Sequence, residues 1–299
     1  MPQFDSLKSK VINYKNIAAG LFLFSIGLFK KVIIADTFAQ WANAGFDGAQ
    51  TLTIIEAWAT SLSYTFQLYF DFSGYTDMAL GVALLFNIRL PINFNSPYKA
   101  LDIQDFWRRW HITLSRFLRD YIYIPLGGNR NGELRTYANL FTVFLIGGLW
   151  HGASWMFVIW GALHGSAIVI HRVWKQLGLS MNKFLAGFIT FNFINITWIF
   201  FRAKEWDDAL RILKAMVGID CAALTEIHRL KELFPSIGMS SYTLPFLIAA
   251  FIITYGFKNS SAYHTHFNPD KKMLLLSILF AVYAVLNLSN VTEFLYFNF

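Results

Sequence analysis

Two histidines, each preceded by a tryptophan, are the residues of this chain best suited to chemistry. They are His111, which follows Trp110, and His151, which follows Trp150. Histidine can both accept and donate a proton near neutral pH, because the free imidazole has a pKa of about 6.5. Ionisable side chains at membrane depth are costly, so such residues are candidates for function. The two dipeptides therefore predict proton-transfer or nucleophilic chemistry in an apolar setting.

His151 comes at the end of an apolar run that extends from Tyr137 to Trp150. Gly147 and Gly148 precede it, and small residues let neighbouring helices approach closely. Gly152 follows and is expected to loosen the helix, which is tolerated at membrane depth where the backbone lines a cavity. This pattern favours a place in a cavity wall. The alternative is a buried structural hydrogen bond between helices.

His111 lies in a basic segment, residues 89–135, which contains eight basic and four acidic residues. This excess of positive charge favours the cytoplasmic side of a membrane. We expect one amphipathic helix, capped by Asp105, whose apolar face includes His111. The other residues of that face are Trp107, Trp110, Leu114, Phe117, Leu118 and Tyr121. A core histidine without a catalytic role is the alternative interpretation.

Arg108 and Arg109 fall on the other side of that predicted helix. Guanidinium groups bind phosphate through paired hydrogen bonds, so these arginines are candidates for docking a phosphorylated donor or an acidic carrier protein. Contact with lipid headgroups is the alternative.

Two further carboxylates, Asp71 and Asp77, occur in the run FQLYFDFSGYTDMALG. Charges in such an apolar setting need partners. They can orient a histidine or line a donor tunnel, or they can pair with Arg108, Arg109 or another buried cation, and we favour the pairing role. Gly74 is expected to break or bend the helix there.

Other catalytic or metal-binding patterns are missing. The sequence has no HExxH, GxSxG, P-loop or GxGxxG motif. His164 and His171 share a helix face but lie about 10.5 Å apart along its axis. His264 and His266 form only a weak pair in a polar loop. We predict no required metal, and Cys221, the one cysteine, is expected to be a buried small residue.

The composition indicates what must position these residues. Of 299 residues, 56% are hydrophobic, 18% aromatic and 14% charged, whereas a soluble domain has about 25% charged residues. The chain is therefore predicted to be an integral membrane protein. The net charge of +7 fits membrane orientation and contact with lipid headgroups. No nucleic-acid-binding module is recognisable.

The order of apolar segments predicts an all-α, polytopic fold with about seven or eight helices that cross or enter the membrane. We assign residues 1–299 to a single membrane domain and expect Trp206 to Val217 to be an amphipathic surface helix with Leu210, Leu213 and Val217 on its apolar stripe. The apolar segments are Ile17 to Phe38, Leu52 to Phe72, Tyr75 to Leu90, Tyr137 to Trp150, Trp155 to Val173, Phe184 to Phe201, Tyr242 to Phe257 and Met273 to Leu288.

Several long motifs together resemble the membrane-bound O-acyltransferase family, most closely its bacterial alginate O-acetyltransferase branch. They are LFKKVIIAD, FQLYFDFSGYTDMALG, PINFNSPY, DFWRRWHITLSRFLRDYIYIPLGGNR, GGLWHGASWMFVIWGALHG and the closing TEFLYFNF. The resemblance implies helices around a transmembrane tunnel. It also implies that His111 and His151 are the key histidines, with His151 the principal catalytic residue.

The resemblance further implies transfer of an acyl group, expected to be acetyl, from a cytoplasmic thioester such as acetyl-CoA or an acyl carrier. The acceptor would be an extracytoplasmic polysaccharide such as alginate, reached with an extracytoplasmic partner protein, in the inner membrane of a bacterium. Peptidoglycan or teichoic acid is the alternative acceptor, and a transporter or scaffold is the alternative function. No permanently bound cofactor is expected. Family members have further helices before the region matched here, so the chain resembles their C-terminal portion.

These expectations give a mechanistic hypothesis. Neutral His151 removes the proton of an acceptor hydroxyl, which attacks the thioester carbonyl. His111 positions the donor or polarises its carbonyl, and an acyl-histidine intermediate is the alternative. Trp110, Trp150, Arg108, Arg109, Asp71 and Asp77 are the candidate substrate-binding residues.

Overall fold

The computed structural model describes residues 2–5, 10–219, 242–265, 267–288 and 295. Every regular element in these residues is a helix, which confirms the predicted all-α class. Cys221, His266 and most of the closing TEFLYFNF lie outside the described residues. The described chain forms two compact units, and the prediction of a single domain over 1–299 stays a prediction. Unit 1 comprises Met1–Ala39, Phe66–Asn95 and Phe257–Asn298, and unit 2 comprises Gln40–Thr65, Ser96–Gly256 and Phe299.

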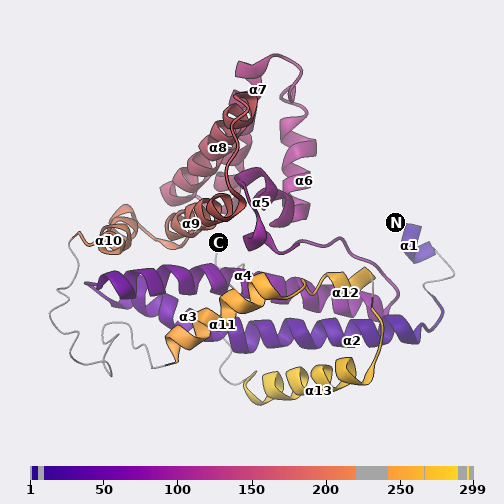
Figure 1. The fold of residues 1–299 in the computed structure, drawn as a ribbon. Helices are drawn as coiled ribbons and strands as arrows, with labels where there is room; N and C mark the ends of the chain where they lie inside the picture. Colours follow the sequence, from indigo (N-terminus) through magenta and orange to yellow (C-terminus); the bar gives the residue numbers. More distant parts are fainter. Residues whose placement is uncertain (1, 6–9, 220–241, 266, 289–294, 296–299) are drawn as a thin grey trace. The chain divides into compact units, whose positions relative to one another are not determined.

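Unit 1 is built on α2 and the second half of α4, with α13 packed along α2 (Figure 1). The side chain of Asn13 caps α2 by accepting hydrogen bonds from the backbone N–H groups of Lys15 and Asn16. A π-helix, η2, continues α2 without interruption. The helices with residues in this unit are α1 (Pro2–Asp5), α2 (Tyr14–Phe29), η2 (Lys30–Ala35), the start of α3 (Asp36–Asn43), α4 (Ile54–Leu85) from Phe66, α12 (Ala262–Thr265) and α13 (Lys271–Leu286).

Glycines let α2 and α4 cross with their backbones in contact. A Cβ atom added to Gly20 would lie 2.7 Å from the carbonyl oxygen of Gly81, and one added to Gly27 would lie 2.5 Å from that of Gly74. The helix does not break at Gly74, one of the two outcomes predicted, because α4 runs without interruption from Ile54 to Leu85. Gly74 is needed for the close approach of α2.

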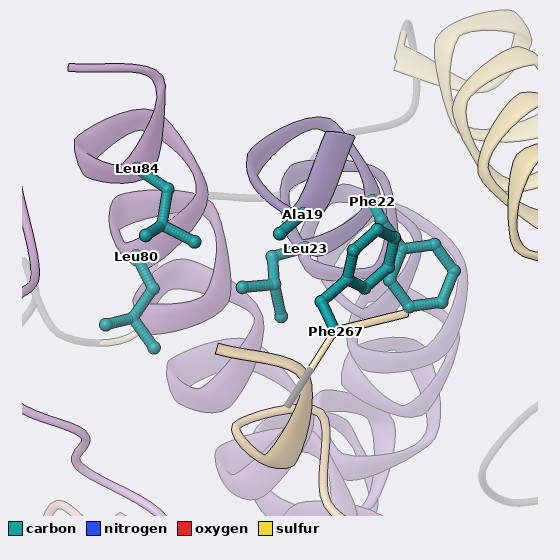
Figure 2. Close-up of a cluster of buried hydrophobic side chains, with 6 residues drawn as sticks. All are labelled: Ala19, Phe22, Leu23, Leu80, Leu84 and Phe267. Carbon is teal, nitrogen blue, oxygen red and sulfur yellow. The ribbon is translucent and has the colours of Figure 1, made fainter. Parts of the chain in front are cut away.

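An apolar cluster joins the same two helices to the chain before α13 (Figure 2). Leu23 of α2 lies against the α4 leucines, while the Phe22 ring packs on Phe267 at 5.5 Å between centroids. The six buried members are Ala19, Phe22, Leu23, Leu80, Leu84 and Phe267. This cluster fixes the register of α2 on α4.

Unit 2 carries both Trp-His dipeptides. Its α7 and α8 pack side by side, and α9 packs on α8 (Figure 1). A Cβ atom on Gly148 would collide with the carbonyl oxygen of Phe157, and one on Gly161 with that of Phe144. The helices with residues in this unit are the end of α3, η3 (Ala44–Gly48), the start of α4, η4 (Pro97–Lys99), α5 (Ile103–Arg109), α6 (Ile112–Leu118), η5 (Arg119–Tyr123), α7 (Glu133–His151), α8 (Trp155–Gln176), α9 (Lys183–Arg202), α10 (Trp206–Met216) and α11 (Thr243–Gly256).

Three helical stretches of the described chain are long and apolar enough to cross a membrane: Tyr14–Gly48, Trp155–Gln176 and Lys183–Arg202. All three were predicted as apolar segments. Helices α11 and α13 also form where predicted, but they contain 14 and 16 residues, fewer than the about 20 that a full crossing takes. Membrane crossing by the remaining helices therefore stays a prediction.

The amphipathic helix predicted from Trp206 is present as α10, but its buried stripe is displaced by one residue. Ala209, Ile212 and Ala215 are buried, whereas Val217 is 70% exposed. Glu205 and Asp208 form a capping box that fixes the start of the helix.

Candidate active site

The segment that contains His111 folds as two short helices, not as the one predicted. The Asp102 side chain accepts a hydrogen bond of 2.7 Å from the backbone N–H of Asp105 and caps α5, so the prediction that Asp105 is the cap is wrong. Helix α5 ends at Arg109 and α6 begins at Ile112. The helical periodicity continues through the gap, which is why the sequence pattern did not reveal the break.

His111 occupies the break in a left-handed backbone conformation, with φ 42° and ψ 55°. This conformation costs a residue with a Cβ atom roughly 1–2 kcal/mol. Ser115 compensates in part, because its hydroxyl donates to the carbonyl oxygen of Trp107 at 3.1 Å and its N–H donates to that of His111 at 3.0 Å. Unusual backbone held by its surroundings is common at functional sites, so the conformation supports a role for His111.

His151 is the last residue of α7 and lies among aromatic rings from three helices. Its imidazole centroid is 5.0 Å from that of Trp150 on the same helix and 4.9 Å from Phe201 on α9. On α8, Trp160 lies at 5.3 Å and Phe157 at 6.1 Å. These rings exclude water from much of the imidazole and hold it in one orientation.

The ring of Trp150 lies near both histidines and connects them in one site. Its ring centroid lies 6.5 Å from that of His111 and 5.0 Å from that of His151. Trp150 is 53% exposed, whereas both histidines are buried. The site therefore consists of two buried imidazoles beside a partly exposed indole, which is a surface that a substrate can reach.

Burial lowers the pKa of His111 to about 4, because the charged imidazolium is poorly solvated there. His111 is thus neutral at physiological pH. A neutral imidazole has one N–H donor and one nitrogen acceptor, so it can hold a carbonyl group or a proton donor.

Trp110, predicted as a substrate contact, lies in the aromatic core and is buried. Its ring stacks on Phe106 at 5.7 Å and packs on Trp198 at 5.0 Å. This environment supports a role in holding the α5–α6 break in place. Direct contact with substrate stays a prediction.

The two arginines differ in their surroundings. Arg109 donates from Nε to Asp105 Oδ1 at 2.9 Å, one helical turn away. Arg108 is exposed. Of the two, Arg108 is therefore the better placed to meet a phosphate or a lipid headgroup.

Asp71 and Asp77 pair with adjacent lysines in unit 1. Asp77 Oδ2 lies 2.6 Å from Lys30 Nζ, and Asp71 Oδ1 lies 2.8 Å from Lys31 Nζ, which also contacts Asp36 Oδ1 at 2.8 Å. The predicted pairing with a buried cation is confirmed, and these cations are lysines of the LFKKVIIAD motif. The partners were not predicted because they come from another helix, although two lysines within an apolar run were a signal.

His164 was considered only as a metal ligand, yet it is fully buried beside the site. Its ring centroid lies 4.7 Å from that of Trp160, which in turn contacts His151. His171 lies near Asp102, with 3.4 Å between Nε2 and Oδ1. No group of three or more metal-binding side chains occurs in the described part of the chain.

Comparison with known proteins places this chain in a family. The family model described as "MBOAT, membrane-bound O-acyltransferase family" matches residues 1–203, a range that includes His111, His151 and His164. The chain belongs to the membrane-bound O-acyltransferase family. The resemblance inferred from the motifs is thereby confirmed.

Several similar proteins have names that state an activity. A peptidoglycan O-acetyltransferase of Helicobacter pylori is 53% identical over 319 aligned positions, which cover 100% of this chain and 60% of the relative. A probable alginate O-acetylase of Pseudomonas aeruginosa is 42% identical over 83% of this chain and 47% of its own length. A teichoic acid D-alanyltransferase of Streptococcus thermophilus is 34% identical over 46% of this chain and 39% of the relative. The chain thus spans between about half and 60% of the first two relatives.

Proposed function

We propose that this protein acts in O-acetylation of an envelope polysaccharide, as a membrane O-acyltransferase that moves an acetyl group from a cytoplasmic thioester to an acceptor hydroxyl outside the membrane. The observation that carries the proposal is the pair of buried imidazoles, His111 and His151, beside the half-exposed ring of Trp150. In a chain of this family, two neutral imidazoles are suited to acyl transfer.

Peptidoglycan is the acceptor that the comparisons favour. The relative named for peptidoglycan shares 53% identity over the whole chain, whereas the one named for alginate shares 42% over 83% of it. Alginate is the second candidate. The sugars of both polymers offer hydroxyl groups, so the same transfer chemistry serves either.

In this proposal His151 is the general base. Its imidazole takes the proton of the acceptor hydroxyl while the oxygen attacks the thioester carbonyl. The carbon–sulfur bond breaks, and the leaving thiolate takes the proton from the imidazolium, so that ester and thiol are the products. General-base help of this kind contributes about 10²–10⁴-fold in rate. His111 holds the thioester carbonyl through its N–H donor.

The basic segment supplies the donor side of the proposal. Arg108 is exposed and is suited to the phosphates of acetyl-CoA or of a carrier-bound thioester. An extracytoplasmic partner protein completes delivery to the polymer, and the site of action is the bacterial inner membrane. The positive charge of residues 89–135 supports cytoplasmic placement of that segment.

The test is chemical. Cells lacking the gene are complemented with the wild-type gene, with His151→Ala or with His151→Gln, and base-labile acetate is measured on purified peptidoglycan and exopolysaccharide. We expect acetate on peptidoglycan to fall to the deletion level in both variants while immunoblots show normal amounts in the membrane. Full acetylation by His151→Ala would remove His151 from the chemistry.

The same strains separate the alternatives. Unchanged acetylation after deletion, together with altered solute flux, would favour a transporter. Normal acetylation with His151→Ala but none after deletion would favour a scaffold. Loss of acetate from exopolysaccharide alone would favour alginate-like acceptors.

A further inference from the structure

His164 of α8 lies one helical turn beyond Trp160 and is fully buried. Its Nδ1 accepts a hydrogen bond of 3.1 Å from the indole N–H of Trp107 on α5. Its Nε2 lies 3.1 Å from the hydroxyl oxygen of Thr197 on α9. Both ring nitrogens therefore have partners, and the partners come from two other helices of unit 2.

The partners fix the protonation state of this imidazole. The indole N–H of Trp107 can only donate, so Nδ1 of His164 must be unprotonated. The Thr197 hydroxyl donates its single proton to the carbonyl oxygen of Ile194 at 2.9 Å, so it accepts from His164 Nε2. His164 is thus neutral and carries its proton on Nε2. Protonation of Nδ1 would set two N–H donors against each other and break the link to Trp107.

The link reaches both parts of the site. Trp107 packs edge-on against Trp160 at 5.8 Å, and Trp160 meets the His151 ring edge-on at 5.3 Å. Trp107 is also one turn before His111, and its carbonyl oxygen accepts the Ser115 bond that spans the α5–α6 break. Trp107 therefore contacts the ring wall of His151 through its indole, and the α5–α6 break beside His111 through its backbone carbonyl.

We propose that His164, through its hydrogen bond to Trp107, is a positioning residue that orients the His151 and His111 imidazoles for acyl transfer. The proposal rests on the proposed function. Because His164 makes its bonds within the protein, its loss should lower kcat and leave KM for the donor unchanged. A displacement of about 1 Å at a reacting group can cost about 100-fold, so we expect a loss of about 10-fold to 100-fold in kcat.

Two conservative variants separate the two hydrogen bonds. His164→Asn places an oxygen acceptor near the position of Nδ1 and can keep the Trp107 bond. His164→Gln places an amide donor near Nε2 and can keep the Thr197 bond. If the hydrogen bond to Trp107 positions the two imidazoles, His164→Asn should have a higher kcat than His164→Gln. Trp107→Phe, which keeps an aromatic ring but lacks the N–H donor, should resemble His164→Gln, and combining the two should add little further loss.

The experiment uses membranes from complemented deletion cells, acetyl-CoA with a labelled acetyl group, and soluble peptidoglycan fragments as acceptor. Initial rates are normalised to the amount of protein. Thr190→Val, at another buried polar residue of unit 2, is the control for the His164 and Trp107 variants and should keep wild-type kcat. If the wild type is active and His164→Asn, His164→Gln and Trp107→Phe all have the same kcat, the positioning role is overturned and the proposed function is left intact. An inactive wild type would instead contradict the proposed function.

A spectroscopic readout tests the bond itself. ¹⁵N-histidine labelling of the purified protein in detergent should give one neutral imidazole signal with the proton on Nε2 that disappears in His164→Asn. It should persist when Thr190 is changed to Val. A proton on Nδ1 of His164 would overturn the assignment, whatever the activity.

Discussion

At the scale of single residues, the backbone conformation of His111 is more informative about the site than the position of His111 in the helical periodicity of the sequence. A left-handed residue between two helices directs its side chain differently from a residue on a helix face. Helical periodicity predicted that His111 shares a face with Trp107 and Leu114, and all three are indeed buried. It also placed Phe117 and Tyr121 on that face, and both are exposed.

The first prediction uses asparagine, which tolerates the left-handed conformation better than other residues with a Cβ atom. His111→Asn should keep the stability of the wild type at pH 7 within about 1 kcal/mol, whereas His111→Ala should unfold more readily because alanine keeps the strain and loses the side-chain contacts. Thermal unfolding in detergent measures this difference. Equal stability of the two variants would show that the backbone strain is unimportant.

The same variant tests the pKa of His111. The folded pKa of about 4 lies below the free value of 6.5, so the stability it contributes is full above pH 6.5 and is lost as the pH falls towards 4. Each unit of pKa difference corresponds to about 1.4 kcal/mol, which gives a loss on the order of 3 kcal/mol. The free energy of unfolding of His111→Asn should therefore fall less steeply than that of the wild type between pH 7 and pH 4. The same pH dependence of the free energy of unfolding in wild type and variant would contradict the shifted pKa of His111.

At the scale of elements, helix positions were predictable and their interruptions were not. Apolar runs predicted α7, α8 and α9 to within a few residues, because a length of apolar sequence is a local property. Whether a glycine ends a helix or lies at a crossing depends on a second helix. Gly74 lies within α4 and meets Gly27 of α2, so its role was not visible in its own segment.

The third prediction concerns the crossing of α7 and α8. Gly148→Ala places a methyl group against the carbonyl oxygen of Phe157, which is backbone and cannot move aside cheaply. We expect a loss of about 1–3 kcal/mol and reduced acetylation, because the same crossing holds His151. Gly256→Ala is the control, since a Cβ atom there meets nothing within 4 Å. Similar unfolding temperatures for the two variants would show that the helices separate readily.

At the scale of the whole molecule, the long motifs predicted the family, whereas pairings between distant segments needed the structure. The lysines of LFKKVIIAD and the carboxylates of FQLYFDFSGYTDMALG belong to two separate motifs in the sequence. In space they form two buried clusters, one with Lys30 bonded to Asp77 and Ser260, the other with Lys31 bonded to Asp71 and Asp36. No periodicity specifies a partner 47 residues away.

The last prediction decides whether Asp77 is a structural or a substrate-binding residue. Removing one partner of a buried ion pair leaves an uncompensated charge and typically costs about 3–5 kcal/mol, whereas replacing both with apolar side chains is often neutral. Asp77→Leu alone should therefore destabilise unit 1, and Lys30→Met combined with Asp77→Leu should recover most of that loss in thermal unfolding. If Asp77 serves only the pair with Lys30, the double variant also recovers acetylation. A double variant that is as stable as the wild type but does not acetylate would instead show that Asp77 or Lys30 acts on the substrate, because the pairing would then be dispensable for folding and one of its members indispensable for transfer.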